Sequence, residues 1–423
     1  MKRFATLLTV FAGLVVAGSA GQPIAEAKEP AVVHATSALA VVGGEIDQPK
    51  LVWLHPQTLK ELKRGVVKLP GAFAVVRSPT GARAVAGSGG TGLEVVNVKK
   101  MKRVAAVARR LGWSVHPISW PVANRVLALE WNDRLGQTLL VADPVARRAV
   151  KRIPFNGYSS WARAGNGVVA VGGPVDAIGP ARLVFVDQAG VTRSVQLDGI
   201  SAGGRTEAGV SDEEPTFRVA SPGIAVDPEI QHAYVVGESG LVADVDLATL
   251  AVTYREVSRP ASLFRRFLDW LQPAAHAKFT NGWQRQVVSL GAGKLAVTGS
   301  DYDGFASHPS YGLELFDLQA GTRRTLNSGS SYAQAAAGVL LAGGGSWDGR
   351  TQIATGVGLT AYTYDGQKLW HTLGDEPVMW FQVAGGYAYV AGPDAYPPTV
   401  RVIDLADGGV RTLRGQLPMF VTD

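Results

Sequence analysis

Short stretches of alternating apolar and polar residues follow one another along most of the chain and are separated by turns. This alternation predicts half-buried β-strands. A strand that ends in Asp, Asn or a related residue recurs eight times, at intervals of 41 to 71 residues. An Asp or Asn side chain there accepts hydrogen bonds from the backbone two residues on and starts a tight turn. The eight strand ends are His55, Asn97, Asp143, Asp187, Asp246, Asp317, Thr363 (or Asp365) and Asp404.

A second strand precedes each of these strands, and in seven of the eight copies it ends in glycine. The third copy has Glu130 at this position. Four antiparallel strands in a repeat of about 40–45 residues are typical of a β-propeller blade. We therefore predict an all-β propeller of eight four-stranded blades, with seven as the alternative. The glycines are Gly43, Gly87, Gly172, Gly237, Gly299, Gly343 and Gly392.

The two ends of the repeat array are complementary. The first repeat begins with its second strand, Ser37–Gly43, and an additional first strand, Leu417–Asp423, follows the last repeat. Pairing of these two segments completes the first blade and removes the open sheet edges of an unclosed array. The sequence therefore predicts a closed ring.

Two of the repeats, "LVADVDLATLAV" and "VRVIDLADGGV", resemble those of the YVTN and quinoprotein-like propeller superfamily. The resemblance covers nearly all of the chain after its N-terminal segment. It implies the propeller fold, and it leaves the function open because such folds carry many unrelated activities.

The N-terminal segment has the pattern of a secretory signal peptide. Lys2 and Arg3 precede the apolar run Leu7–Ala17, and small residues follow it. We expect cleavage after Ala27, with Ala20 as the alternative site. The chain then divides into a signal peptide, 1–27, and one propeller domain, 28–423. No later stretch is apolar for long enough to form a transmembrane anchor.

The composition narrows the chemistry. The 423 residues include no cysteine, which excludes disulfides, lipoprotein acylation at cysteine and thiolate-bound metals. The net charge of +6 does not require a nucleic-acid partner. We expect a secreted or envelope protein that is monomeric and does not bind nucleic acid.

The long insertions all fall at one face of the predicted ring. They are the insertions 199–216 and 258–281 and the loops Ser300–Gly312 and Gly344–Gly358. Because function is usually carried on elaborated loops, this face is the predicted functional face. The insertion 258–281 includes an apolar and basic pattern that predicts a short helix over 260–272, serving as a lid, a plug or a docking element.

An aromatic residue followed two places later by a polar residue recurs near the start of the first strand of four repeats. A spacing of two puts both side chains on the same side of a strand. The rings either wedge between neighbouring blades or line the central channel, where they would stack on a sugar or another flat ligand. The predicted ligand-binding residues are Trp161, Arg163, Trp283, Arg285, Tyr332, Gln334, Trp380 and Gln382.

Other site signals are weaker. Asp301 and Asp303 resemble the start of a calcium loop but lack its remaining ligands, and His308 is the one histidine in a long loop of the functional face. The stretch Tyr364–Leu373 resembles the tryptophan repeat of PQQ-dependent dehydrogenases, but it occurs once. We expect no PQQ, and calcium remains a minor alternative.

These patterns favour a binding or interaction module for an envelope glycan or another small ligand. One alternative is a sugar or lactone lyase or hydrolase that uses His308, Asp301 and Asp303, with or without a metal. Another is a scaffold that docks a protein partner through the predicted helix.

Overall fold

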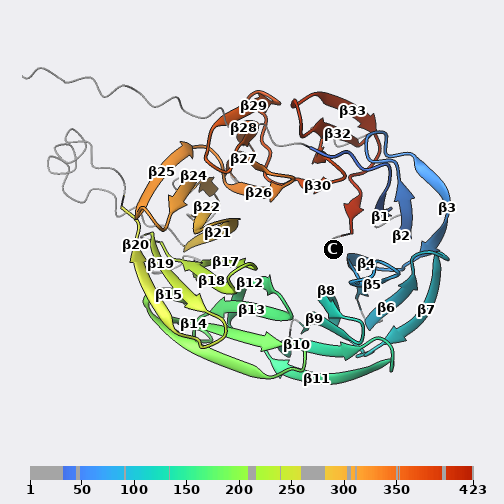
Figure 1. Cartoon of the computed structure of the whole chain (residues 1–423), viewed down its shortest axis with the longest axis horizontal. Coiled ribbons are helices and arrows are strands. Elements are labelled where there is room, and N and C mark those ends of the chain that lie inside the picture. The colour runs from blue at the N-terminus through green and yellow to red at the C-terminus, as the bar shows by residue number, and fades with distance from the viewer. Residues whose placement is uncertain are drawn as a thin grey trace, which may run out of the picture.

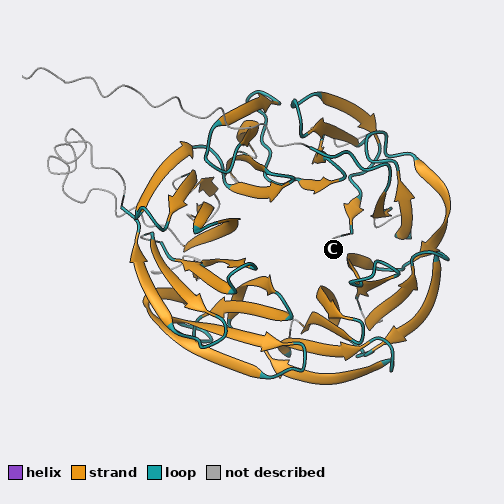
Figure 2. Ribbon diagram, viewed as in Figure 1, coloured by secondary structure: helices purple, strands orange, loops and turns teal. Residues whose placement is uncertain are grey.

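In the computed structural model, the chain forms a ring of antiparallel sheets around a central opening, as in a β-propeller (Figure 1). The structure describes residues 32–43, 48–89, 92–132, 134–207, 216–238, 240–258, 282–302, 306–309, 312–348, 351, 353–392 and 397–421. Within these ranges the chain consists of strands, turns and loops without a helix (Figure 2). The predicted all-β, propeller-like architecture is thus confirmed.

Several predictions concern residues outside the described ranges. They are the signal peptide 1–27, the helix 260–272 and Asp303. No helix of the described part is long and apolar enough to cross a membrane.

Five sheets have four strands each. The first contains β34 (Met419–Phe420), β1 (Ala38–Val42), β2 (Lys50–Leu54) and β3 (Glu61–Lys68). The next two are formed by β4 (Ala72–Arg77), β5 (Arg83–Ser88), β6 (Gly92–Asn97) and β7 (Lys102–Val107), and by β8 (Ser114–Val122), β9 (Arg125–Asn132), β10 (Gly136–Asp143) and β11 (Arg148–Pro154). The last two are formed by β17 (Gly223–Asp227), β18 (His232–Val236), β19 (Leu241–Asp246) and β20 (Val252–Glu256), and by β30 (Gln382–Ala384), β31 (Tyr387–Ala391), β32 (Thr399–Asp404) and β33 (Val410–Arg414).

The sixth sheet has 14 strands and contains the strands of three predicted repeats. The first of these repeats supplies β12 (Tyr158–Ala164), β13 (Gly167–Gly172), β14 (Ile178–Asp187) and β15 (Thr192–Glu207). The other two supply β21 (Gly282–Gly291), β22 (Lys294–Tyr302), β24 (Leu313–Asp317) and β25 (Thr322–Asn327), and β26 (Tyr332–Ala336), β27 (Val339–Asp348), β28 (Ile353–Tyr362) and β29 (Lys368–Thr372). Two linking strands join them, β16 (Thr216–Ser221) and β23 (Ala306–Pro309).

The linking strands correct our prediction of the sheet count. β16 pairs antiparallel with β15 and parallel with β21, and β23 pairs with both β22 and β27. The backbone N–H and C=O groups of β16 and β23 thereby find hydrogen-bond partners in two different four-stranded units. Unpaired backbone groups are costly, which favours such pairing. The described residues therefore form six sheets, and not the eight or seven separate ones that the repeat predicts.

The ring is closed as predicted. β34 pairs antiparallel with β1, with Ala40 opposite Phe420 and Val41 opposite Met419. The Val421 N–H also donates to the Leu39 carbonyl at 2.9 Å. The first sheet thus combines strands from opposite ends of the described chain.

The turns that follow the third strand of the repeats also form as predicted. Asp143 Oδ1 accepts hydrogen bonds from Val145 N at 2.9 Å and Ala146 N at 2.8 Å. Asp246 Oδ1 binds Ala248 N in the same way at 2.7 Å. These backbone donors lower the pKa of Asp246, because they stabilise the carboxylate.

The recurrent glycines have a steric reason. A Cβ atom on Gly87 would collide with the Val115 carbonyl oxygen of the next sheet. At Gly172 and Gly299 it would collide with the backbone of the innermost strand segment beside them. The close approach of two backbones therefore requires glycine at the end of the second strand.

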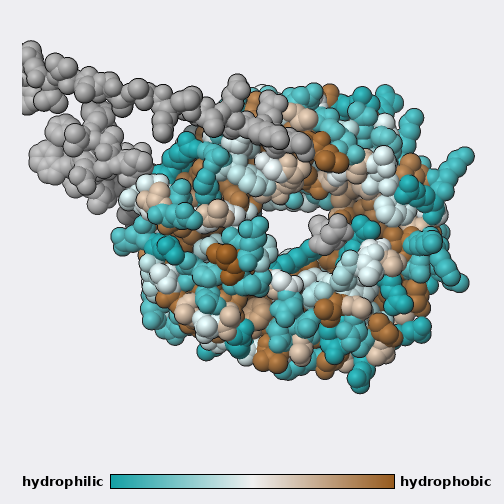
Figure 3. Space-filling view, in the orientation of Figure 1, coloured by the Kyte–Doolittle hydropathy of each residue, from teal (hydrophilic) through white to brown (hydrophobic). Residues whose placement is uncertain are grey.

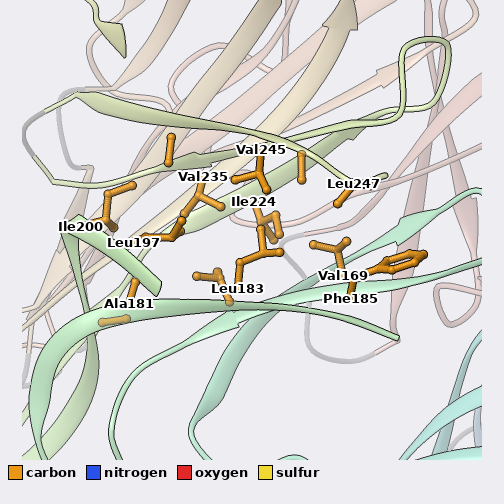
Figure 4. Packing of buried hydrophobic residues seen from close by; sticks show 14 of the residues in the cluster. Val169, Ala181, Leu183, Phe185, Leu197, Ile200, Ile224, Val235, Val245 and Leu247 are labelled. Carbon is orange, nitrogen blue, oxygen red and sulfur yellow. The ribbon is translucent and has the colours of Figure 1, made fainter. Parts of the chain in front are cut away.

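The hydrophobic core lies between neighbouring sheets rather than at the centre of the ring. In Figure 4, Val169, Leu183 and Leu197 from one unit face Val235 and Val245 of the β17–β20 sheet. Because sheets are packed sideways against one another, the inner edges of the innermost strands lie toward the central opening.

Candidate functional site

The central opening contains a cavity of about 980 Å³ that is lined mainly by the innermost strands. β4, β8, β12, β26, β30 and β34 contribute to its wall, together with β1. Figure 3 shows the opening through the molecule. Six of the eight predicted ligand-binding residues line this cavity: Trp161, Arg163, Tyr332, Gln334, Trp380 and Gln382.

Two indole rings of the lining are accessible. Trp161 is 38% exposed and Trp380 is 50% exposed. Trp161 lies in β12, which within the described chain pairs only with β13, so its other edge is not covered by a strand. Its ring contacts the His116 ring edge-to-face at 6.0 Å between centroids. A large apolar ring held in this way is available for stacking.

The second accessible indole has a buried neighbour. Trp380 comes just before β30, and the next residue, Phe381, is fully buried. Phe381 packs edge-to-face against Tyr332, with 4.9 Å between the ring centroids. Burial raises the pKa of the Tyr332 hydroxyl, and a hydrogen bond with the Trp380 side chain opposes this shift. Phe381 therefore anchors the wall, while Trp380 remains exposed.

The charged side chains of the lining are basic. Arg77, His116 and Arg163 line the cavity, and the described lining residues include no Asp or Glu. Arg163 Nε donates to the Ile118 carbonyl of the neighbouring sheet at 2.7 Å. Burial first, and then the charge of Arg163, lowers the pKa of His116. The charged groups of the described lining are therefore basic, and burial favours the neutral form of His116.

The two glutamines of the predicted pattern have different roles. Gln382 Nε2 donates to the Pro418 carbonyl at 2.8 Å, and its Oε1 accepts from Phe420 N at 2.9 Å. Gln382 thus holds β34 in the closed ring. Gln334 Oε1 is buried and has no hydrogen-bond partner among the described residues. Buried acceptors are usually paired, so this oxygen is an exception among the polar atoms of the wall.

The remaining predicted pair lies elsewhere. Trp283 and Arg285 are buried, with exposed fractions of 8% and 4%, and neither lines the central cavity. Arg285 Nη2 donates to the Glu238 carbonyl at 3.2 Å. β16 pairs with β21 at Ala220 and Trp283, and Gly223 of β17 lies against the backbone of Arg285.

The weaker candidates are only partly placed. Asp301 of β22 lies directly opposite His308 of β23 in the strand pairing. Asp303 falls outside the described residues. Within the described part of the chain, no group of three or more His, Cys, Asp or Glu residues is arranged to hold a metal ion.

Three lining residues were missed by the sequence pattern, namely Trp53, Arg77 and His116. His116 precedes its aromatic neighbour, and Trp53 belongs to β2, the third strand of its repeat, so the aromatic-then-polar spacing does not detect either. Arg77 is the last residue of β4, and its position at the end of an innermost strand was the available signal.

Comparisons with known proteins bear on the fold. No family model and no curated protein matches the chain. The structure of dihydro-heme d1 dehydrogenase NirN in complex with DHE is 12% identical, with a TM-score of 0.52, and the match covers 92% of this chain and 76% of that one. BamB from Moraxella catarrhalis is 14% identical, with a TM-score of 0.44 and coverage of 90% and 99%. The computationally designed Ika8 protein is 11% identical, with a TM-score of 0.44 and coverage of 91% and 99%. The first likeness concerns the fold alone, and the other two are too distant to add to it.

Proposed function

We propose that this protein is an exported binding module that holds a small ligand, such as an envelope glycan, in its central channel. The observation that supports this proposal is the accessibility of Trp161 and Trp380, which both line a cavity of about 980 Å³. Exposed indoles in a concave site are suited to stacking on a sugar ring or another flat group.

Polar groups of the same wall complement the rings. Arg163 is positioned by its bond to Ile118, and Gln334 Oε1 lacks a partner among the described residues. A few fixed polar groups in a largely apolar pocket orient a ligand and give specificity. The channel therefore combines a stacking surface with hydrogen-bonding groups.

Titration of the protein with a panel of envelope oligosaccharides tests this function, with tryptophan fluorescence and calorimetry as readouts. We expect Trp161→Ala and Trp380→Ala each to weaken binding by about ten-fold, because the ligand loses an aromatic stacking partner worth roughly 0.5–1.5 kcal/mol beyond the area it buries. Trp347→Ala is the matched control, since Trp347 is 37% exposed but does not line the cavity. Equal losses in all three variants, or no response of the unmodified protein, would overturn the proposal.

We also propose that the 14-stranded sheet represents three of eight blades of a YVTN-like ring. Three sets of four consecutive antiparallel strands can be followed within it, β12–β15, β21–β25 without β23, and β26–β29. In this interpretation β16 and β23 are additions at one mouth of the ring. An experimental structure at a resolution that resolves these two strands tests it.

Export is the remaining part of the proposal and depends on the signal-peptide pattern of residues 1–27. Expression of the full gene product with its native leader, followed by N-terminal sequencing of the exported protein, tests it. We expect a new N-terminus after Ala27 or Ala20. Retention of the whole leader on protein in the cytoplasm would contradict it.

A further inference from the structure

The two guanidinium groups of the channel lie where the innermost strands end. Arg77 is the last residue of β4, and Arg163 comes just before the turn between β12 and β13. Trp161 precedes Arg163 by two residues, so the ring and the guanidinium project to the same side about 7 Å apart along the strand. The wall therefore changes from aromatic to cationic along its height.

A second cavity adjoins the channel at this end. It has a volume of about 630 Å³, and Arg77 and Arg163 line it as well. The rest of its wall comes from the turn Ser78–Gly81, from Ser119–Pro121 near the end of β8, and from Gly165. The two arginines therefore separate the channel from an opening at the short-turn face of the ring.

Both arginines are held in place by their surroundings. Arg163 is bonded to the Ile118 carbonyl, and Arg77 has its guanidinium carbon 6.0 Å from the centre of the Trp53 ring. A Cβ atom on Gly81 would come within 2.6 Å of Arg77 Nη2, so the glycine leaves room for this guanidinium. Positioned guanidinium groups bind oxyanions at a lower entropic cost than flexible ones.

The charge of the wall selects the ligand class. The described lining of both cavities contains two arginines and one histidine but no carboxylate. Ser78, Thr80 and Ser119 add hydroxyl groups to the second cavity. A cavity lined by one sign of charge attracts ligands of the opposite sign, and arginine forks suit carboxylate and phosphate geometry.

We infer that the ligand of the channel is an acidic saccharide, whose carboxylate or phosphate group lies at Arg77 and Arg163 while a sugar ring stacks on Trp161. This inference rests on the proposed binding function and specifies its ligand class. It also gives the ligand a direction, with its anionic group toward the short-turn face, which is the face opposite to the predicted functional one.

Calorimetry with three oligosaccharides of equal length tests the inference: a neutral galactose oligomer, a galacturonate oligomer and a sugar-phosphate oligomer. We expect both acidic probes to bind at least about ten-fold more tightly than the neutral probe, and their Kd values to rise with salt concentration. The two acidic probes distinguish carboxylate from phosphate as the preferred group. Equal affinities for acidic and neutral probes would overturn the inference and leave the binding function in place, whereas binding of no probe would count against the binding function itself.

Substitution variants test whether the two arginines cause the preference for acidic probes. Arg77→Gln and Arg163→Gln are expected to weaken acidic probes by about ten-fold or more while neutral binding changes less than two-fold. Arg148→Gln removes the same charge from an exposed position on the outer strand β11 and is the control. Arg163→Lys keeps the charge, and circular dichroism confirms that each variant is folded. Equal weakening of acidic and neutral probes, or an effect of Arg148→Gln as large as that of Arg163→Gln, would overturn the assignment.

Discussion

Two innermost strands carry the same short pattern and place it in different surroundings. β12 presents Trp161 and Arg163, and β21 presents Trp283 and Arg285. Trp161 is accessible and lines the channel, whereas Trp283 and Arg285 are buried. The two strands have different neighbours: β16 pairs with β21, while the corresponding edge of β12 has no paired strand in the described chain. The surroundings of the strand, and not the pattern itself, determine whether such a tryptophan can serve a ligand.

The largest expected effect comes from replacing each of the two tryptophans by alanine in turn. Trp283→Ala removes a buried ring, and we expect the free energy of unfolding to fall by about 3–5 kcal/mol. Trp161→Ala removes a ring that is 38% exposed, and we expect a loss of about 1 kcal/mol or less. Urea denaturation followed by circular dichroism measures both. Similar losses would show that the two rings have equivalent structural roles and would contradict the comparison.

The contact between β16 and β21 can be disturbed directly. A Cβ atom on Gly282 would lie 2.7 Å from the Val219 oxygen and 2.8 Å from its nitrogen, so Gly282→Ala must displace β16. We expect a loss of about 1–3 kcal/mol and greater quenching of Trp283 fluorescence by acrylamide. Gly89→Ala is the control, since its nearest neighbour would be Ser114 Oγ at 3.8 Å. Unchanged quenching in Gly282→Ala would show that β16 is not what covers Trp283.

A similar contrast is expected between the two glutamines. Gln382→Ala removes two hydrogen bonds that hold β34, and we expect it to lower the free energy of unfolding by about 1–2 kcal/mol. Gln334→Ala removes an oxygen without a described partner, and the expected loss is less than half as large. Thermal and urea denaturation of both variants compare them. A larger effect at Gln334 would contradict the roles assigned here.

The smallest effect concerns pH. The pKa of His116 is lowered in the folded protein. In the unfolded chain the imidazole has its ordinary pKa of 6.5, so the unfolded state binds the proton more readily. The stability contribution of neutral His116 is therefore present above pH 6.5 and is lost as the pH falls below it. Burial first, and then the charge of Arg163, oppose a charged imidazole, and Arg77 lines the same cavity. We expect His116→Gln to lose less stability than the unmodified protein between pH 7.5 and pH 5.5. Equal losses would contradict this.

Much of the fold was predictable, because its determinants are local. Asp143 and Asp246 act on backbone groups two residues on, and the glycines at strand ends leave room for adjacent backbones. Ring closure followed from counting strands at the two ends. The linking strands were not predictable, since β16 and β23 pair across insertions and no local pattern specifies those partners.

The candidate site was predicted only in part, because local patterns do not specify contacts between residues distant in sequence. The spacing of two detected residues that share one side of a strand, such as Trp161 and Arg163. It could not separate them from Trp283 and Arg285, whose burial depends on a neighbour distant in sequence. Nor could it detect Arg77 or His116, which join the cavity only through the circular arrangement of the sheets.

Pairing of β34 with β1 has a consequence for synthesis. Until Met419 and Phe420 are available, the first sheet lacks its innermost member, and the backbone of β1 presents unsatisfied groups to the solvent. A truncated product that stops before Pro418 would keep this unpaired strand edge. We therefore expect products of premature termination to aggregate rather than to accumulate as partial rings.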